Sequence, residues 1–279
     1  MVSVIVPAHN EARVIGRLLT QLVADSQQGV MDLVVVANGC TDDTAVVAAS
    51  FGSGVRVLSV PVASKREALV AGDQAAIGYP RVYVDADVEL NAEDVWALAE
   101  ALARPGVLAA GPRRVLATNE SPRLVRWYYD IWMRLPEVRD GLFGRGVIAV
   151  SEAGHARVAS LPPLLSDDLA ASLAFAPDER LIVPGSKVLI HPPRTVKDLI
   201  RRRIRVVTGV TQIERTTDAP DSVARTRPRD LLSIVSQEPL LMPKLIVFIA
   251  VTVLARLRGQ QAANRRDYST WRRDESSRV

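Results

Sequence analysis

The sequence contains one cysteine, Cys40, among its 279 residues. A single cysteine excludes an internal disulfide and a cysteine-rich zinc site, and it is typical of proteins from a reducing compartment. We expect Cys40 to be a small buried side chain. The first strand-like residues lead directly into the polar His9, Asn10 and Glu11, so the basic flank and long apolar stretch of a signal peptide are missing. We therefore expect a cytoplasmic protein.

Long hydrophobic runs are also scarce. The longest one, residues 245–255, has 11 residues and is interrupted only by Thr252, whereas a membrane-spanning helix needs about 20. We therefore expect that this segment does not cross a membrane. Lys244 on one side and Arg256 and Arg258 on the other frame the run, as in helices that lie on a membrane surface. Two interpretations of residues 231–258 stay open: peripheral association with the cytoplasmic face of the inner membrane, and docking on the rest of the protein.

The sequence lacks repeats and low-complexity tracts, and with 48% hydrophobic and 24% charged residues it describes a folded protein. The net charge of +4 is unevenly distributed, because residues 194–279 contain 18 Lys and Arg against 9 Asp and Glu. This excess predicts contact with something anionic, such as a phospholipid surface or a diphosphate-bearing acceptor, unless it is only a solvated face. We expect no nucleic-acid partner, and the oligomeric state is unknown.

Short valine-rich runs alternate with helix-like segments in the first part of the chain. The runs are residues 2–6, 32–37, 55–60 and 81–84. This alternation predicts βαβ units and a mostly parallel sheet covered on both faces, that is, an α/β fold. Asn10 is a plausible N-cap for the first helix, and Thr41 begins the second.

Three polar clusters follow these strands: residues 7–11, 38–41 and 85–87. In open α/β sheets the ligand crevice lies at the carboxyl ends of the strands, so we expect the clusters to meet at one edge. Later in the chain, the pattern predicts an aromatic helix over 124–135, a strand over 180–190 and an arginine-rich helix over 195–214. An apolar helix over 231–257 should break at Pro239 and Pro243.

The central chemical feature is Asp85-Ala86-Asp87. In an extended backbone, side chains at i and i+2 point the same way, so both carboxylates could bind one ion. Carboxylate oxygens suit Mg²⁺ or Mn²⁺, and a nucleotide diphosphate would complete the coordination. Taken alone, this pattern also occurs as a solvated acidic turn.

Four segments together resemble family 2 glycosyltransferases in order and spacing. They are residues 3–11 (SVIVPAHNE), 34–44 (VVVANGCTDDT), 64–69 (SKREAL) and 84–88 (VDADV). The resemblance implies a GT-A fold: a Rossmann-like, mostly parallel sheet flanked by helices, with a C-terminal helical extension. It also implies an inverting, hexosyltransferase-type enzyme of cell-envelope biosynthesis. Such an enzyme uses Mn²⁺ or Mg²⁺ and moves a sugar from a nucleotide-diphosphate sugar to a saccharide or lipid-linked acceptor.

The resemblance also implies roles for individual residues. Pro7, Ala8 and Glu11 would line the base and ribose pocket, Asn38 would face the base, and Lys65 would lie near it. A carboxylate beyond a strand end can accept hydrogen bonds from ribose hydroxyls, and a lysine can offset phosphate charge. Glu11 and Lys65 could instead be ordinary residues of a surface helix start.

Two positions depart from the family pattern. The family usually has an aromatic residue at the position of His9 and an aspartate at that of Asn38. An aspartate only accepts hydrogen bonds, whereas an asparagine donates and accepts, so a base other than uracil could be read. We favour UDP over GDP.

For the general base, Ser166-Asp167-Asp168 resembles the family's acidic acceptor-site motif, in which the last carboxylate takes the proton of the attacking hydroxyl. Inverting transfer needs one base and no covalent intermediate, so Asp168 suffices. The same three residues would open a helix equally well, and catalysis and capping could be shared between Asp167 and Asp168.

Two further candidates come from the second half. Residues 202–206 (RRIRV) lie where many members have Q-x-x-R-W, and only Arg205 matches. It could contact pyrophosphate or acceptor charge, or belong to a solvated or membrane-facing basic face. His191 lies where GT-A enzymes often place a third metal ligand beside Asp85 and Asp87, although a lone histidine is usually structural.

We divide the chain into a nucleotide-sugar-binding half (1–115), an acceptor-binding and catalytic half (116–215) and a basic helical extension (216–279). A nucleotidyltransferase is the first alternative, but that class usually has a glycine-rich phosphate loop, which residues 7–11 lack. The second is a degenerate nucleotide-sugar-binding module, and the carboxylates Asp85, Asp87 and Asp168 argue against such decay.

Overall fold

The computed structural model describes residues 1–24, 31–161, 167–216, 226–264 and 276, without the side chains of 167, 212–216 and 262–264. In this part of the chain, seven strands form one sheet in the order β3-β2-β1-β4-β6-β5-β7. The strands are β1 (Val2–Ala8), β2 (Met31–Asn38), β3 (Val55–Val60), β4 (Arg81–Val84), β5 (Ala109–Leu116), β6 (Val147–Val150) and β7 (Arg180–Ile190). Only β6 pairs antiparallel with its neighbours, which confirms the predicted mostly parallel sheet.

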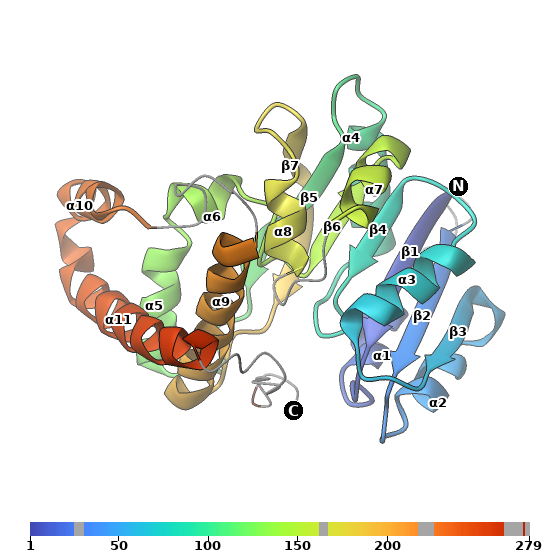
Figure 1. The fold of residues 1–279 in the computed structure, drawn as a ribbon, viewed down its shortest axis with the longest axis horizontal. Coiled ribbons are helices and arrows are strands. Elements are labelled where there is room, and N and C mark those ends of the chain that lie inside the picture. The colour runs from blue at the N-terminus through green and yellow to red at the C-terminus, as the bar shows by residue number, and fades with distance from the viewer. Residues whose placement is uncertain (25–30, 162–166, 217–225, 265–275, 277–279) are drawn as a thin grey trace.

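Helices connect the strands and cover both faces of the sheet (Figure 1). They are α1 (Ile15–Ala24), α2 (Thr44–Ala49), α3 (Lys65–Ala75), α4 (Ala92–Leu102), α5 (Arg123–Trp132), α6 (Pro136–Asp140), α7 (Glu152–Ala159), α8 (Asp167–Leu173), α9 (Val196–Thr216), α10 (Pro228–Gln237) and α11 (Met242–Asn264), with short 3-10 turns η2 (Gly52–Gly54) and η3 (Pro239–Leu241). The four strands predicted from valine content are all present, and β3 and β4 have the predicted bounds.

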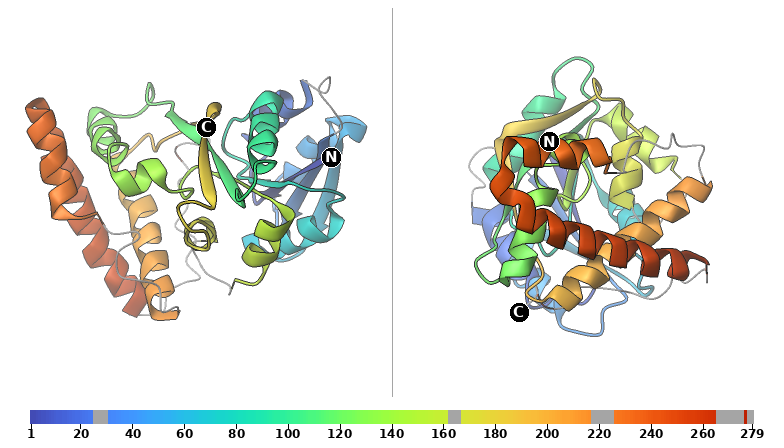
Figure 2. Two further views of the ribbon diagram at one scale, coloured as in Figure 1. Left: turned by 90° about the horizontal axis from the view of Figure 1, so that it is seen from above. Right: turned by 90° about the vertical axis from the view of Figure 1, so that its left-hand side faces the viewer.

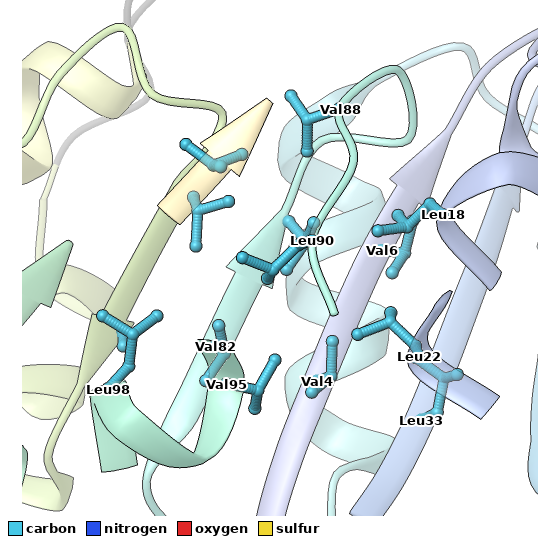
Figure 3. Close-up of a cluster of buried hydrophobic side chains, with 14 of the residues drawn as sticks. Val4, Val6, Leu18, Leu22, Leu33, Val82, Val88, Leu90, Val95 and Leu98 are labelled. Carbon is cyan, nitrogen blue, oxygen red and sulfur yellow. The ribbon is translucent and has the colours of Figure 1, made fainter. Parts of the chain in front are cut away.

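The main core lies between the sheet and the two helices α1 and α4 (Figure 3). Val4 and Val6 of β1 are fully buried there, packed with Leu18 of α1 and Leu98 of α4. Fully burying such a side chain contributes about 1.5–3 kcal/mol. The opposite face is covered as well, because Val34 and Val36 of β2 are buried beneath α3. Coverage of both faces explains why these strands are continuous apolar runs.

Helix α3 lies unusually close to β1, and this approach places the start of the helix at the sheet edge. A Cβ atom on Gly72 would lie 2.4 Å from Cγ2 of Ile5, so only glycine fits the contact. At the first turn, the hydroxyl of Ser64 accepts a hydrogen bond from the backbone N–H of Glu67 (3.3 Å), which is a standard N-cap. Lys65 is therefore held just beyond the ends of β1 and β2.

The expectation that Asn10 caps the first helix is wrong. The helix begins at Ile15, and Asn10 has a left-handed backbone (φ 53°), which asparagine tolerates better than most residues. Its Oδ1 instead accepts a hydrogen bond from the backbone N–H of Thr41 (2.8 Å). The side chain thus joins the loop after β1 to the loop after β2.

Helices α5, α9, α10 and α11 gather at the β7 end of the sheet, with α11 outermost (Figure 2). One face of α11 packs against α5 and α9, where Leu245, Phe248 and Val251 are buried. The ring of Phe248 stacks on that of Tyr128, with centroids 5.1 Å apart. This face is docked on the rest of the protein, in agreement with the second of the two interpretations of residues 231–258.

The predicted break at Pro239 is confirmed, but Pro243 lies in the first turn of α11, where a missing N–H costs nothing, and does not break the helix. The helical segment is longer than its apolar core suggests. Within the described residues, the stretch from Pro239 to Gln261 is long and apolar enough to cross a membrane by length and composition alone. Counting only residues 245–255 therefore underestimated its length.

Candidate active site

Lys65 and Asp85 form an ion pair at the edge where β1, β2 and β4 end. The ammonium nitrogen of Lys65 lies 2.8 Å from Oδ1 of Asp85, and both side chains are partly exposed. The backbone N–H of Asp85 donates to the carbonyl of Gly146 (2.7 Å). The end of β4, the start of α3 and the segment before β6 are thus joined at one point.

The acidic segment from Asp85 to Val88 is a turn rather than an extended strand. The N–H of Val88 lies 3.4 Å from the carbonyl oxygen of Asp85, so the expected extended backbone is wrong. Burial nevertheless alternates: Ala86 and Val88 are 3% and 4% exposed, whereas Asp85 and Asp87 are half-buried. The turn therefore buries its apolar side chains and keeps both carboxylates accessible.

Gly146 allows this turn to lie against the start of β6. Its φ is +67°, and a Cβ atom there would lie 2.6 Å from Cγ1 of Val88 and 3.3 Å from Oδ2 of Asp85. Any side chain would both strain the backbone and push the acidic turn away. The glycine-rich stretch thus has a specific role in placing Asp85.

The residues predicted to surround the nucleotide base hold the neighbouring loops together. Asn38 is buried, and with its amide nitrogen facing β1 it donates to the carbonyl of Ala8 (2.8 Å) and accepts from the N–H of Ser64 (3.2 Å). Ala8 and Glu11 are buried too, and the N–H of Glu11 donates to the hydroxyl of Thr44 (2.8 Å). Their contacts with a nucleotide stay predictions.

Pro7 and Cys40 lie beside these loops. Pro7 lines a cavity described below. Cys40 is only half-buried, and its thiol donates to the carbonyl of Ala8 (3.3 Å). It therefore behaves as a weak hydrogen-bonding group of the loop rather than as the fully buried side chain that we expected.

Asp168 lies in the first turn of α8, with both carboxylate oxygens held by backbone donors. Oδ2 accepts from the N–H of Gly144 and Oδ1 from the N–H of Leu169, each at 2.8 Å. The carboxylate thus accepts a backbone hydrogen bond at the start of α8 and also fixes the glycine-rich loop. The expected roles in helix capping and in catalysis are therefore compatible. Ser166 and the side chain of Asp167 lie outside the described residues.

Arg114, which was not among the predicted site residues, supports the loop that holds Asp168. This side chain is 5% exposed and donates to the carbonyls of Gly144 (3.0 Å), Phe143 (2.7 Å) and Val138 (3.0 Å). Its guanidinium also lies over the ring of Trp132, 4.7 Å from the centroid. Arg114 therefore positions the N–H group that binds Asp168.

Arg145 supports the same loop from its other side. It is almost fully buried and donates to the carbonyls of Gly141 (3.0 Å), Pro112 (2.8 Å) and Arg139 (2.8 Å). Burial, together with the repulsion from Arg145 and Arg202, lowers the pKa of Arg114 to about 9. Positive charge is therefore concentrated on this side of Asp168.

Two cavities meet at Lys65, Asp85 and Asp168, which line both of them. The first, which we call the apolar cavity, has a volume of about 180 Å³. Its other walls are mainly hydrophobic and include Leu69, Leu142, Val158 and Ala170.

The second, which we call the arginine cavity, has a volume of about 220 Å³. It lies between α5 and α9 and is lined by Tyr129, Trp132, Phe143, Arg202, Arg203 and Arg205. The predicted Arg205 thus shares a cavity with the predicted base, and Arg202 and Arg203 line the same cavity.

His191 is paired with Glu89. Its Nε2 lies 2.6 Å from Oε1 of Glu89, and Oε2 of the same carboxylate accepts from the side-chain amide of Gln21 (2.8 Å). A backbone bridge between Glu89 and Leu189 brings the end of β7 to the acidic turn. No group of three or more His, Cys, Asp and Glu side chains in the described ranges could hold a metal ion. A metal-binding role for His191 stays a prediction.

A polar cluster at one end of the apolar cavity centres on Tyr83. Its hydroxyl donates to Oδ1 of Asp73 (2.9 Å) and lies 2.9 Å from Nδ1 of His155. Arg81 contacts both Asp73 (2.6 Å) and Nε2 of His155 (3.3 Å). Burial and then Asp73 raise the pKa of Tyr83. Burial, the largest effect, and Arg81 lower the pKa of His155 against the opposing effect of Asp73.

Comparisons with known proteins agree with this arrangement. Residues 3–153 match the model of the family "Glycosyl transferase family 2". Among curated protein sequences, none matches the chain. A solved structure of the mannosyltransferase PcManGT from Pyrobaculum calidifontis, in complex with GDP-Man and Mn²⁺, is 20% identical with a TM-score of 0.61, covering 99% of this chain and 84% of that one.

Glucosyl-3-phosphoglycerate synthase from Mycobacterium tuberculosis, solved with Mn²⁺, UDP-glucose and phosphoglyceric acid, is 24% identical with a TM-score of 0.54. The match covers 80% of this chain and 81% of that one. At such identities the structures show the fold alone, and the family follows from the match over residues 3–153. The chain therefore belongs to glycosyl transferase family 2 and has the α/β GT-A fold.

Proposed function

We propose that this glycosyltransferase moves a sugar from a nucleotide-diphosphate sugar to an acceptor hydroxyl in one displacement, with inversion at the anomeric carbon. The observation that carries the proposal is the position of Asp168, which lines both cavities together with the pair of Lys65 and Asp85. Residues 1–115 would bind the donor and residues 116–215 the acceptor. Membership of family 2 removes the support for a nucleotidyltransferase.

The residues of the acidic turn fit a divalent cation. Asp85 and Asp87 present accessible carboxylates and no soft ligands, which suits Mn²⁺ or Mg²⁺. Two carboxylates leave positions for diphosphate oxygens and water, and His191 could join through Nδ1 while its Nε2 stays paired with Glu89. A bound ion would neutralise the charge that develops on the departing diphosphate. Lys65 would add a second positive charge next to it.

Asp168 would act as the general base. Its two backbone donors, Gly144 and Leu169, fix the carboxylate at the junction of the cavities, so that an acceptor hydroxyl can reach it. A single positioned carboxylate meets the requirement of an inverting transfer. The side chain of Asp167, the other candidate, is not described.

For the donor base, we propose UDP in preference to GDP. Pro7 and Ala8 are the last residues of β1, Glu11 lies in the loop after it, and Asn38 is the last residue of β2, as a base and ribose pocket at this edge requires. The similar solved structures include one with UDP-glucose and one with GDP-Man. A panel of nucleoside diphosphates with and without Mn²⁺ should show the largest rise in melting temperature with UDP and Mn²⁺ together, because a ligand of the native state stabilises it. A larger rise with GDP would reverse the choice.

Two substitutions separate donor binding from catalysis. Asp87→Ala should abolish Mn²⁺-dependent binding of UDP, measured by calorimetry, because half of the carboxylate pair is lost. Asp168→Asn should bind UDP and Mn²⁺ nearly as the wild type does and yet lose transfer, by at least about a hundredfold, because an amide cannot accept the proton. Unchanged binding in Asp87→Ala would refute the metal site, and turnover by Asp168→Asn would refute the base.

The acceptor would be a saccharide or lipid-linked molecule, and we propose that α11 brings the enzyme to a membrane surface. The face of α11 opposite to its docked side is exposed and apolar; its large side chains are Met242, Ile246, Ile249, Val253 and Leu257. Arg256 and Arg258 are exposed at its end. Apolar residues flanked by cations match an anionic leaflet, such as the cytoplasmic one.

Flotation with vesicles of phosphatidylglycerol and phosphatidylcholine tests this association. The double variant Ile246→Gln/Ile249→Gln should lose most vesicle binding, because it removes apolar area without touching the docked face. Val46→Gln is the matched control, since Val46 is equally exposed but lies on α2 near the other end of the sheet. Equal flotation of the wild type and the double variant would overturn the proposal.

A further inference from the structure

Three arginines of one helix line the arginine cavity. Arg202, Arg203 and Arg205 of α9 all line it and are half-buried, so their guanidinium groups are partly desolvated. Buried Arg114 lies behind the same wall. Partly desolvated guanidinium groups bind phosphate and carboxylate more strongly than exposed ones do, and with a preferred geometry.

Among the described residues, three carboxylates line the cavity together with the arginines and Lys65: Asp85, Glu137 and Asp168. Asp85 faces Lys65, and Asp168 already accepts two backbone hydrogen bonds. Glu137 also lines the cavity, and its buried Oε1 has no hydrogen-bond partner. Burial first, and then repulsion from Arg145 and from Arg202 of the cavity wall, lowers the pKa of Arg114.

The position of the cavity favours the acceptor over the donor. The loops predicted to bind the nucleotide follow β1 and β2, whereas α9 follows β7 at the other end of the strand order. Asp168 lies between these regions and lines the cavity itself. An acceptor whose hydroxyl reaches Asp168 from the α9 side would extend towards the arginines.

The remaining walls are aromatic. The rings of Tyr129 and Trp132 meet edge to face with centroids 5.5 Å apart, and both line the cavity with Phe143. Its volume of about 220 Å³ is several times the roughly 30 Å³ that a water molecule takes in the liquid. Aromatic faces next to guanidinium groups suit a small carbon skeleton that carries an anionic group.

We propose that the arginine cavity binds an acceptor bearing a phosphate or carboxylate group, with Arg202 and Arg203 holding that group while the acceptor hydroxyl faces Asp168. The inference rests on the proposed transferase function and narrows its acceptor to an anionic one. The anion could belong to a soluble sugar phosphate or to a lipid headgroup, and both present the same chemistry to the arginines.

The test uses the full chain saturated with UDP and Mg²⁺, so that the donor site is filled. Inorganic phosphate, glucose 6-phosphate and glucose are then titrated calorimetrically. We expect both phosphate probes to bind and glucose to bind at least about tenfold more weakly than glucose 6-phosphate, because it lacks the charge-assisted hydrogen bonds. Vesicles containing phosphatidic acid, added as a competitor, distinguish a lipid source: displacement of glucose 6-phosphate indicates a headgroup, and no displacement indicates a soluble acceptor.

Variants on α9 complete the experiment. Arg202→Gln and Arg203→Gln should each weaken glucose 6-phosphate binding by roughly tenfold and leave UDP binding unchanged. The control is Arg201→Gln: Arg201 is 47% exposed, pairs with Asp198 (3.2 Å) and should keep wild-type binding. Absence of phosphate binding by the wild type, or weaker UDP binding in the Arg202 and Arg203 variants, would overturn the inference. A wild type that binds no UDP with Mg²⁺ would instead refute the transferase proposal.

Discussion

The ammonium group of Lys65 lies 2.8 Å from Oδ1 of Asp85, so the proposed metal site already contains a positive charge from the protein itself. A lysine held in this place offsets the repulsion between two neighbouring carboxylates. It is also near enough to meet a diphosphate that would arrive with a cation. The enzyme should therefore bind the metal ion weakly on its own and more tightly with a nucleotide.

Replacing Lys65 should affect these two steps in opposite directions. In Lys65→Met, Mn²⁺ alone should bind up to about fivefold more tightly, since a partly exposed pair is worth at most about 1 kcal/mol. UDP with Mn²⁺ should bind roughly tenfold more weakly, because a charge that faces the diphosphate is lost. Calorimetric titrations measure both. Arg66→Met serves as the control for metal binding, and weaker binding of Mn²⁺ alone by Lys65→Met would contradict the expectation.

Gly146→Ala should damage the metal site through the backbone. The new Cβ atom would lie 2.6 Å from Val88 and 3.3 Å from the carboxylate of Asp85, so the acidic turn must move. Metal-dependent UDP binding should fall by at least about tenfold, as measured by calorimetry.

Gly144→Ala is a closely matched control for that change. Gly144 has nearly the same positive φ (65°), but a Cβ atom there would meet Trp132 at an ordinary 3.5 Å. Both variants should lose about 1–2 kcal/mol of stability from left-handed strain. Only Gly146→Ala should lose nucleotide binding, and equal losses in both would show that strain alone explains the effect.

Arg114→Met should unfold more easily and turn over more slowly. The substitution leaves the carbonyls of Gly144 and Phe143 without this buried donor and removes the closer of the two arginine donors of Val138, which should cost about 3 kcal/mol or more of unfolding free energy. The Gly144 N–H would then hold Asp168 less firmly, so kcat should fall more than the affinity for UDP. Urea unfolding and steady-state kinetics measure the two effects. The exposed Arg113→Met should stay within about 0.5 kcal/mol of the wild type.

His155 should make stability depend on pH. Tyr83 donates to Asp73, so Nδ1–H of His155 donates to Tyr83, and Nε2 accepts from Arg81. Burial first, and then the charge of Arg81, makes the pKa of His155 lower in the folded chain than in the unfolded chain, against the opposing effect of Asp73. From about pH 6.5 downwards the unfolded chain takes up the proton first, so stability should fall with pH until the folded pKa is passed. In His155→Gln the slope of the unfolding free energy against pH should decrease by up to the contribution of one bound proton. An unchanged slope would contradict the assignment.

The sheet was largely predictable because its strands are valine-rich and covered on both faces. Two strands were not predicted: β5, residues 109–116, and β6, residues 147–150, which inserts antiparallel between β4 and β5. Four apolar residues carry no sign of direction, and pairing between segments far apart in the chain decides it. The turn at Asp85 could not be predicted either, because it depends on contact with Gly146, which lies just before β6.

Motifs in the sequence name Lys65, Asp85 and Asp168, and the structure places all three along the same cavities, while their roles stay predictions. The supporting arginines were not predictable, because basic residues are usually exposed. One signal was available for Arg114: in the strand that contains it, side chains alternate between faces, and Arg114 follows Arg113 on the opposite face. The partner of His191 could not be foreseen, because Glu89 reaches it only through the bridge to β7.

Helix α11 rests on α5 and α9, and these two helices carry the aromatic and guanidinium side chains of the arginine cavity. Helix α11 thus supports both walls of the arginine cavity from outside. Truncation before α11 would remove the packing that supports α5 and α9. Loss of activity in such a variant would therefore indicate a disrupted arginine cavity rather than the loss of a lipid anchor. For the same reason, a surface that binds the exposed face of α11 would act, through α5 and α9, on the arginine cavity.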